Sequence, residues 1–227
     1  MEPSPLVRPR SYVTRGRKTE AQSRAIEELW PAFGLEFDGS PLDLEAAFGR
    51  TAPRVVEIGF GNGENLLTLA ERHPDRDFVG IEVHGAGIGR VLGAIRDDGL
   101  TNIRIIRHDA VEVFERGLAA ASLDEVLIFF PDPWPKARHH RRRLIQPEVA
   151  PLLARALTDD GVLRLATDWE PYAEHMIDVL DAEPGLVNLA GDARFVPRPD
   201  DRPVTKFERR GERLGHAIFD LAYRPAR

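Results

Sequence analysis

The chain has 227 residues, of which 42% are hydrophobic, and it carries a formal net charge of −6. This length suits one domain with a small appendage, and the apolar content supports a packed core and argues against a chain that is disordered throughout. The absence of cysteine excludes disulfides, thiolate nucleophiles and thiolate metal ligands.

The sequence shows no sign of a membrane or export segment. No apolar run approaches the ~20 residues that a membrane-spanning helix needs. The first residues hold scattered arginines without the apolar stretch of a signal peptide. We therefore expect a soluble, cytoplasmic protein without a membrane partner.

Charge is distributed unevenly along the chain. Residues 8–18, 136–143 and 202–213 each hold five Lys or Arg, and only the third window also holds acids, Glu208 and Glu212. A surface that gathers these windows would attract a polyanion, whereas the acidic remainder would resist non-specific coating by nucleic acid. The alternative is that each run is an unrelated solvated face.

The N-terminal part differs from the rest. Residues 1–18 contain three prolines and no hydrophobic periodicity, so we expect them to be mobile. Thr19 and Gln22 then have capping-box spacing at the start of a helix whose apolar residues share one face. We expect residues 1–50 to form a basic arm and a docked helix, and residues 51–227 to form the main domain.

From residue 54 onward, strands alternate with helices. The pattern predicts strands at 54–59, 77–82, 103–107, 123–130 and 161–167, with helices at 64–72, 86–97, 148–157 and 170–180 and a short helix from 110. Such alternation predicts a doubly wound α/β fold with a mostly parallel sheet. The last segment, 217–223, follows a long loop without a clear helix, and we expect it to join the sheet antiparallel.

The first strand contains Glu57 and ends in a glycine-rich turn with Gly59, Gly61 and Gly63. Glycines at such a turn let the backbone approach a ligand closely. Dinucleotide-binding turns have a further glycine where this chain has Glu64, and an anion at a helix N-terminus disfavours a phosphate ligand. The turn therefore favours a nucleoside cofactor without phosphate, and S-adenosylmethionine is one.

Two more carboxylates follow the next two strands. Glu82 ends the second strand, where a carboxylate can accept both hydroxyl protons of a ribose, in NAD enzymes and in methyltransferases alike. Asp109 follows the third strand and is placed to accept from the amine of adenine. Either acid alone could instead cap a helix, but acids at three successive strand ends indicate a nucleoside site.

The most informative motif follows the fourth strand. Residues 130–135 read Phe-Pro-Asp-Pro-Trp-Pro and lead into the cationic stretch 136–143. A carboxylate, Asp132, between two prolines and next to a guanidinium cluster predicts a base held beside a phosphate backbone. Trp134 could stack on that base or simply pack against the loop. Asp168, after the next strand, could contact substrate or cap a helix, and no histidine has metal-ligand spacing.

These motifs resemble those of the bacterial tRNA (guanine-N7-)-methyltransferases, which are S-adenosylmethionine-dependent enzymes with a Rossmann-like fold. The resemblance covers residues 55–223 and rests on the segments 57–63, 80–84, 109–112, 129–136, 166–169 and 205–208. The family commonly has His where this chain has Pro135, a departure that bears on the stiffness of the loop.

The resemblance implies the roles of particular residues. It implies that S-adenosyl-L-methionine is bound by Glu57, Glu82 and Asp109 and that Asp132 is the active-site carboxylate. Contacts with a guanine in the variable loop of tRNA, or with nearby RNA, are implied for Lys136, Asp168, Thr205, Lys206, Phe207 and Glu208. We further expect RNA phosphates at Arg138, Arg141, Arg142 and Arg143, and no metal. Whether the protein is a monomer or a homodimer is not predicted.

Three other functions compete with this interpretation. A methyltransferase acting on an adenine amine or a glutamine amide would have a related motif, but in the order Asp-Pro-Pro-Tyr. A nicotinamide-dependent oxidoreductase would share the fold, although Glu64 argues against its pyrophosphate. An RNA-binding protein without catalysis would have no need of the cofactor carboxylates.

Overall fold

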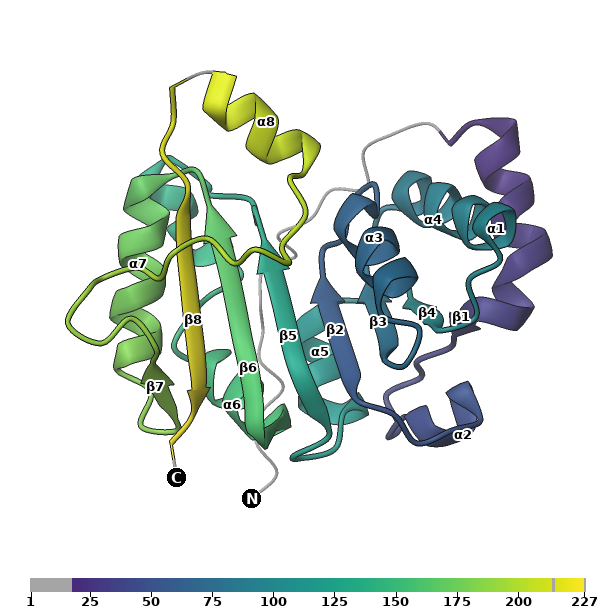
Figure 1. Cartoon of the computed structure of the whole chain (residues 1–227), viewed down its shortest axis with the longest axis horizontal. Helices are drawn as coiled ribbons and strands as arrows, with labels where there is room; N and C mark the ends of the chain where they lie inside the picture. Colours follow the sequence, from purple (N-terminus) through teal and green to yellow (C-terminus); the bar gives the residue numbers. More distant parts are fainter. Residues whose placement is uncertain (1–17, 214, 227) are drawn as a thin grey trace.

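The computed structural model of the protein describes residues 18–213 and 215–226. Its centre is an eight-stranded sheet in the order β1-β4-β3-β2-β5-β6-β8-β7 (Figure 1). The strands are β1 (Gly34–Leu35), β2 (Arg54–Ile58), β3 (Asp77–Ile81), β4 (Ile103–Ile106), β5 (Leu123–Phe129), β6 (Leu157–Thr167), β7 (Leu186–Asn188) and β8 (Phe219–Pro225). Residues 1–17, where we predicted a mobile arm, lie outside the described residues.

The pairing confirms the predicted fold class. All neighbouring strands from β1 to β6 pair in parallel, and β8 pairs antiparallel with both β6 and β7. Strand order reverses at β2, because β3 lies on one side of it and β5 on the other. Loops diverge at such a switch point and leave a crevice at the carboxyl ends of the strands.

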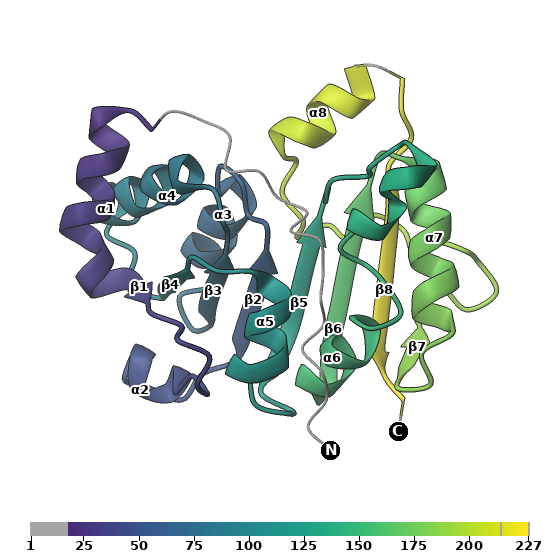
Figure 2. The same ribbon diagram turned by 180° about the vertical axis from the view of Figure 1, so that it is seen from behind.

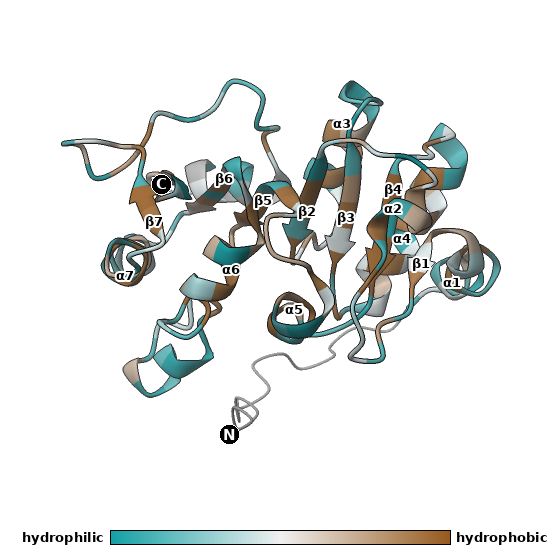
Figure 3. Cartoon of the chain, turned by 90° about the horizontal axis from the view of Figure 1, so that it is seen from below, coloured by the Kyte–Doolittle hydropathy of each residue, from teal (hydrophilic) through white to brown (hydrophobic). Residues whose placement is uncertain are grey.

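Helices cover the sheet on both faces. They are α1 (Glu20–Phe33), α2 (Leu44–Phe48), α3 (Glu64–Arg72), α4 (Gly85–Asp98), α5 (Ala110–Glu112), the π-helix η1 (Val113–Gly117), the 3-10 helix η2 (Ala137–Arg142), α6 (Ala150–Ala156), α7 (Glu170–Asp181) and α8 (Lys206–Arg213). Figure 2 shows α5, α6 and α7 in front of the sheet. In the view from below, hydrophobic residues gather along the strands between the helical layers (Figure 3).

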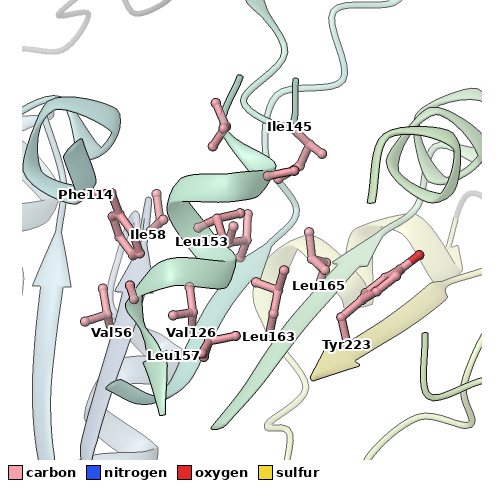
Figure 4. Packing of buried hydrophobic residues seen from close by; sticks show 14 of the residues in the cluster. Val56, Ile58, Phe114, Val126, Ile145, Leu153, Leu157, Leu163, Leu165 and Tyr223 are labelled. Atoms are coloured by element: carbon pink, nitrogen blue, oxygen red, sulfur yellow. The ribbon is translucent and has the colours of Figure 1, made fainter. Parts of the chain in front are cut away.

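Alternation along the strands produces two apolar cores, since successive side chains point to opposite faces. Val56 and Val126 belong to the core under α5, η1, α6 and α7 (Figure 4). Val55 and Phe78 belong to the core under α1, α3 and α4. The sheet is therefore buried on both faces around β2, which fixes the strand ends that carry the predicted site.

The helix predicted after Thr19 packs on α4. Thr19 and Gln22 form a reciprocal capping box at the start of α1. A side chain at Gly89 of α4 would meet the backbone oxygen of Gln22 at 2.5 Å, so the two helices approach closely. None of the helices in the described part of the chain is long and apolar enough to cross a membrane.

The structure also contains elements that the sequence pattern did not predict: β1, α2, β7, η2 and α8. α8 falls in the stretch that we expected to lack a helix. Before α8, the chain crosses the face of β8, β6 and β5 that is opposite to α6 and α7 (Figures 1 and 2). An isolated bridge between Val196 and Asp220 of β8 holds this crossing segment to the sheet.

Candidate active site

A cavity of about 400 Å³ opens at the carboxyl ends of β2, β3, β4 and β5. Its walls are the loops after these four strands, the start of α3, and Thr205 just before α8. Four of the predicted carboxylates line it together: Glu57, Glu82, Asp109 and Asp132. The topology therefore gathers into one site acids that are far apart in the sequence.

The glycine-rich turn forms the floor of the cavity beside β2. Gly59, Gly61 and Gly63 all have left-handed backbone, with φ of 71°, 56° and 77°. Gly63 has a second reason to be glycine, because a Cβ there would meet the Val91 side chain at 2.2 Å. The glycines thus bring backbone close to the cavity, which Phe60 and Asn62 of the same turn also line.

Glu82 holds this turn in place. Its carboxylate is buried and accepts hydrogen bonds from the backbone N–H groups of Gly61, Val83 and His84, at 3.0, 2.7 and 3.0 Å. The carboxylate fixes the turn and still lines the cavity, where its remaining acceptor position is available to a hydroxyl group.

Glu57 is the most deeply buried carboxylate of the site, with 4% of its surface exposed. Burial raises its pKa to about 7, while a hydrogen bond from Asn65 opposes the rise and the charge of Glu82 adds to it. Asn65 Nδ2 donates to Glu57 Oε2 at 3.0 Å. Asn65 lines the cavity, and its Oδ1 atom is buried without a hydrogen-bond partner.

Asp109 caps a helix and also faces the cavity. It accepts a hydrogen bond from the backbone N–H of Val111 at 2.8 Å, at the start of α5. The neighbouring His108 lines the cavity, and its Nε2 lies 2.7 Å from Glu112. Sequence reasoning did not identify His108 or Asn65, because neither belongs to a motif with recognisable spacing.

Residues 130–135, which we call the Asp132 loop, are held in an unusual conformation. Phe130 and Trp134 have left-handed backbone, with φ of 51° and 44°, which is uncommon for bulky residues. Asp132 is exposed at the cavity wall between them. The Trp134 ring lies under the Arg142 guanidinium, 5.0 Å away, and meets the His139 ring edge-on at 5.8 Å. Trp134 therefore packs against its basic neighbours and also lines the cavity.

The basic stretch forms η2 at the edge of the cavity. Lys136, Arg138 and Arg141 are exposed, whereas Arg142 is half-buried and lines the cavity. Exposed cations beside an open cavity suit contact with a phosphate backbone.

Arg143 does not fit the phosphate contact that we predicted for it. Only 3% of its surface is exposed. Its guanidinium donates to the carbonyl oxygen of Pro133 at 2.9 Å and lies 4.9 Å from the Tyr172 ring centroid. Burial lowers its pKa, with the nearby Tyr172 opposing the shift. Arg143 therefore braces the Asp132 loop from behind.

Asp168 follows β6 and faces α8 instead of lining the cavity. Its Oδ2 lies 3.3 Å from His216 Nδ1, and a side chain at Gly211 of α8 would meet the same oxygen at 3.0 Å. Thr205 lines the cavity and its Oγ1 accepts from the backbone N–H of Glu208 at 3.3 Å. The side chains of Lys206 and Phe207, which we predicted to contact substrate, lie outside the described part of the structure.

Glu208 is buried in an ion-pair network. It accepts two hydrogen bonds from Arg202, at 2.8 and 2.9 Å, and one from Arg198 at 3.0 Å. Three of its acceptor positions are thus used inside the protein.

Among the described residues there is no group of three or more His, Asp or Glu side chains arranged to hold a metal ion.

Comparison with known proteins identifies the family. Residues 51–221 match the family Methyltransf_4, described as "Putative methyltransferase". The chain is 76% identical over 225 residues to the tRNA (guanine-N(7)-)-methyltransferase of Leifsonia xyli, and the match covers 99% of each chain. The chain belongs to the tRNA (guanine-N(7)-)-methyltransferase family.

Another member of this methyltransferase family agrees with that assignment, and more distant solved structures share the fold. The enzyme of Xanthomonas campestris is 59% identical, over 94% of this chain and 82% of its own length. The 16S rRNA methyltransferase KamB shares the fold with a TM-score of 0.59 at 15% identity, over 81% of this chain and 93% of KamB. The resistance methyltransferase Kmr superimposes with a TM-score of 0.55 at 15% identity, over 85% of this chain and 95% of its own.

Proposed function

We propose that this protein transfers a methyl group from S-adenosylmethionine to N7 of a guanine in the variable loop of tRNA. Family membership at 76% identity supports the reaction. The structural observation that best supports the proposal is the shared cavity, which is lined by acids from three successive strand ends and by Asp132. A basic, exposed η2 lies next to this cavity.

The cavity fits the cofactor in its donors and acceptors. Glu82 and Asp109 offer acceptors for the ribose hydroxyls and the adenine amine, and Glu57 offers a carboxylate for the ammonium of the methionine part. The buried Oδ1 of Asn65 also lacks a hydrogen-bond donor, although buried acceptors are nearly always satisfied in folded proteins. S-adenosylmethionine supplies a methyl group activated by a positively charged sulfur.

The chemistry requires placement more than proton transfer. N7 of guanine has a free lone pair, so it forms the new bond to the methyl carbon as the carbon–sulfur bond breaks, and no general base is needed. Holding the two reactants in line provides much of the rate gain. Positive charge develops on the purine, and the Asp132 carboxylate stabilises that charge more in the transition state than in the ground state.

Different residues serve the binding of RNA and the placement of the base. Lys136, Arg138 and Arg141 are exposed and would hold phosphates, which positions the RNA without reading its sequence. Arg142 lines the cavity and would contact the RNA where the base enters. Thr205 also lines the cavity and is the member of the segment 205–208 that we assign to direct contact with the guanine.

The direct test is incubation of the protein with an unmodified tRNA transcript and labelled S-adenosylmethionine, followed by nucleoside analysis. We expect the label in 7-methylguanosine, in a tRNA fragment that contains the variable loop. Label in a methylated adenine, or label only in protein, would instead favour the exocyclic-amine or glutamine reaction. A tRNA with the variable-loop guanine changed to adenine is the matched control and should remain unlabelled.

A further inference from the structure

A single buried guanidinium connects the Asp132 loop, α8 and the sheet. Arg202 lies on the segment that crosses β8, β6 and β5, and 4% of its surface is exposed. It forms two parallel hydrogen bonds with Glu208 of α8, at 2.8 and 2.9 Å. On its other side, Nε lies 2.9 Å from Oδ1 of Asp220 in β8, and Nη2 donates to Oδ2 at 3.2 Å.

The same guanidinium packs against the start of the Asp132 loop. Its central carbon lies 5.7 Å from the ring centroid of Phe129 and 5.9 Å from that of Phe130. Phe130 has left-handed backbone and donates its N–H to Ala166 at 2.8 Å. A bulky residue keeps that conformation only where its surroundings determine it, and Arg202 forms part of those surroundings.

α8 lies over the cavity side of the sheet. Figure 1 shows it above the arrowheads of β5 and β6. Thr205, which precedes α8, lines the cavity, and Arg209 Nη2 lies 3.2 Å from Oε2 of Glu64 on the opposite wall. Glu208 anchors α8 to the rest of the protein, because it forms ion pairs with Arg202 and Arg198.

Only an arginine can make this set of contacts. The planar fork of a guanidinium binds one carboxylate with two donors and keeps further donors for a second carboxylate, which a lysine ammonium cannot do in the same plane. Burial raises the pKa of Asp220, and the charge of Arg202 is the largest opposing influence. Removing Arg202 would leave Asp220 buried without a cation and Glu208 with Arg198 alone.

We propose that Arg202 is a positioning residue that fixes α8 against the Asp132 loop and thereby places the guanine relative to Asp132. Arg202 does not line the cavity formed by the four strand-end loops, so its effect on the reaction is exerted through Glu208, Phe130 and the segments that carry them. The inference rests on the proposed function for its kinetic consequence, but its structural consequence for α8 is independent of any activity.

The matched pair of variants is Arg202→Lys and Arg104→Lys. Arg104 also packs its guanidinium against two phenylalanine rings, at 4.8 and 5.8 Å, and donates to backbone carbonyls, but it lies on β4 away from α8. Both variants should lose thermal stability. Only Arg202→Lys should slow single-turnover methylation at saturating tRNA, by about tenfold or more, because a small misplacement of the reactants is enough for such a loss.

A second readout needs no catalysis. Amide hydrogen exchange should accelerate in residues 205–213 of Arg202→Lys and remain unchanged in α8 of Arg104→Lys. The affinity for S-adenosylhomocysteine should stay within about twofold of the parent in both variants. If the parent methylates nothing but exchange in α8 still depends on Arg202, the proposed function fails and the positioning role of Arg202 stands.

The double variant Arg202→Met with Asp220→Asn separates an effect on the methylation rate from a loss of folding. It removes the buried carboxylate that would lose its cation and leaves Glu208 paired with Arg198, so the protein should fold stably. We expect this stable variant to methylate as slowly as Arg202→Lys or more slowly. A parental rate in the double variant, or equal rates in Arg202→Lys and Arg104→Lys, would overturn the inference and reduce Arg202 to a stabilising ion pair.

Discussion

Asp132 stands between two residues with left-handed backbone, in a loop braced from behind by Arg143 and flanked by prolines. Strain of this kind persists in proteins where the surrounding structure imposes it, and it is concentrated at functional sites. The result is a loop backbone that holds Asp132 at the cavity wall. In the reaction that we propose, the charge of Asp132 faces the purine as positive charge develops there.

Changing Asp132 to Asn keeps the shape of this side chain and removes its charge. Single-turnover methylation should fall by roughly 10²–10³-fold if the loss resembles that of one oxyanion-hole donor. The affinities for tRNA and for S-adenosylhomocysteine, measured separately, should change far less, because the carboxylate acts mainly in the transition state. A near-parental rate would make Asp132 a turn residue without a role in the transition state.

Glu57 should make the stability of the protein depend on pH. Its pKa rises from an ordinary 4.5 to about 7 in the folded protein, chiefly through burial. Between these values the folded state holds a proton that the unfolded chain releases, so the free energy of unfolding falls as the pH rises through this window. The upper limit of the effect is about 3.5 kcal/mol, at ~1.4 kcal/mol per pKa unit.

The matching measurement is urea unfolding of the parent and of Glu57→Gln at pH 5 and pH 7.5. The parent should lose stability relative to the Gln variant between the two pH values, since glutamine cannot ionise. Parallel pH dependence in the two proteins would show that Glu57 does not titrate in this range. Binding of S-adenosylhomocysteine, which brings an ammonium to the site, should reduce the difference.

At the scale of elements, two glycines of α4 let it pack closely on both of its neighbours. A Cβ at Gly87 would meet the backbone oxygen of Gly61, in the glycine-rich turn, at 2.0 Å. Gly89 makes the equivalent close approach to Gln22 of α1. Helix α4 therefore presses directly on the turn that faces the cavity, and its position depends on residues with no side chain.

Gly87→Ala should weaken the binding of S-adenosylhomocysteine by about tenfold or more and lower stability by roughly 1–3 kcal/mol, as overpacking does elsewhere. Gly93→Ala in the same helix is the control, because a Cβ there meets nothing within 4 Å. That change should leave binding unaltered and add about 0.5–1 kcal/mol of stability. Calorimetric titration and thermal unfolding of both variants measure these effects, and equal binding by the two would refute the close approach.

The alternation of strands and helices predicted the central strands, because each buried strand is a short apolar run and each helix carries an apolar stripe. It did not predict α8, whose residues Lys206 to Arg213 include only one apolar side chain and offer no such stripe. Glu208 of that helix is held by ion pairs with Arg198 and Arg202, a few residues upstream, and Arg202 is in turn paired with Asp220 of β8. Ion pairs of this kind leave no periodic pattern in the sequence. Strands β1 and β7 are too short, at two and three residues, to show a period.

The site residues, like the helices and strands, were predicted where a sequence pattern marks them and missed where tertiary contacts decide. The acids at strand ends were identified because a parallel sheet brings its carboxyl ends to one edge, whatever the loops do. The run 136–143 did not reveal that Arg143 is buried while Arg141 is exposed, because a block of like charges has no pattern that separates its faces. Tertiary contacts with Pro133 and Tyr172 make that distinction.

At the scale of the whole molecule, charge is separated between an acidic body and exposed cations near the cavity. Because Arg143 is buried, the phosphate contacts are assigned to the exposed residues of η2. Arg138→Ala with Arg141→Ala should weaken the binding of all tRNAs alike and flatten the dependence of binding on salt, with a slope reduced by about one per lost phosphate contact. Affinity for S-adenosylhomocysteine should not change.

A control for this patch is Arg96→Ala. Arg96 is equally exposed but lies in the last turn of α4, paired with Asp97. Filter binding of tRNA across a range of salt concentrations compares the variants, and the Arg96 variant should follow the parent. If the double variant in η2 keeps the parental salt dependence, the basic run is only a solvated face.

The central claim, that the acceptor is N7 of guanine, can be tested by replacing that atom. A tRNA transcript made with 7-deazaguanosine has carbon in place of N7 and keeps the exocyclic amine, O6 and N1 of every guanine. With labelled S-adenosylmethionine, we expect rapid labelling of the ordinary transcript and none of the deaza transcript, although both bind the protein. Labelling of the deaza transcript at a comparable rate would contradict methyl transfer to N7.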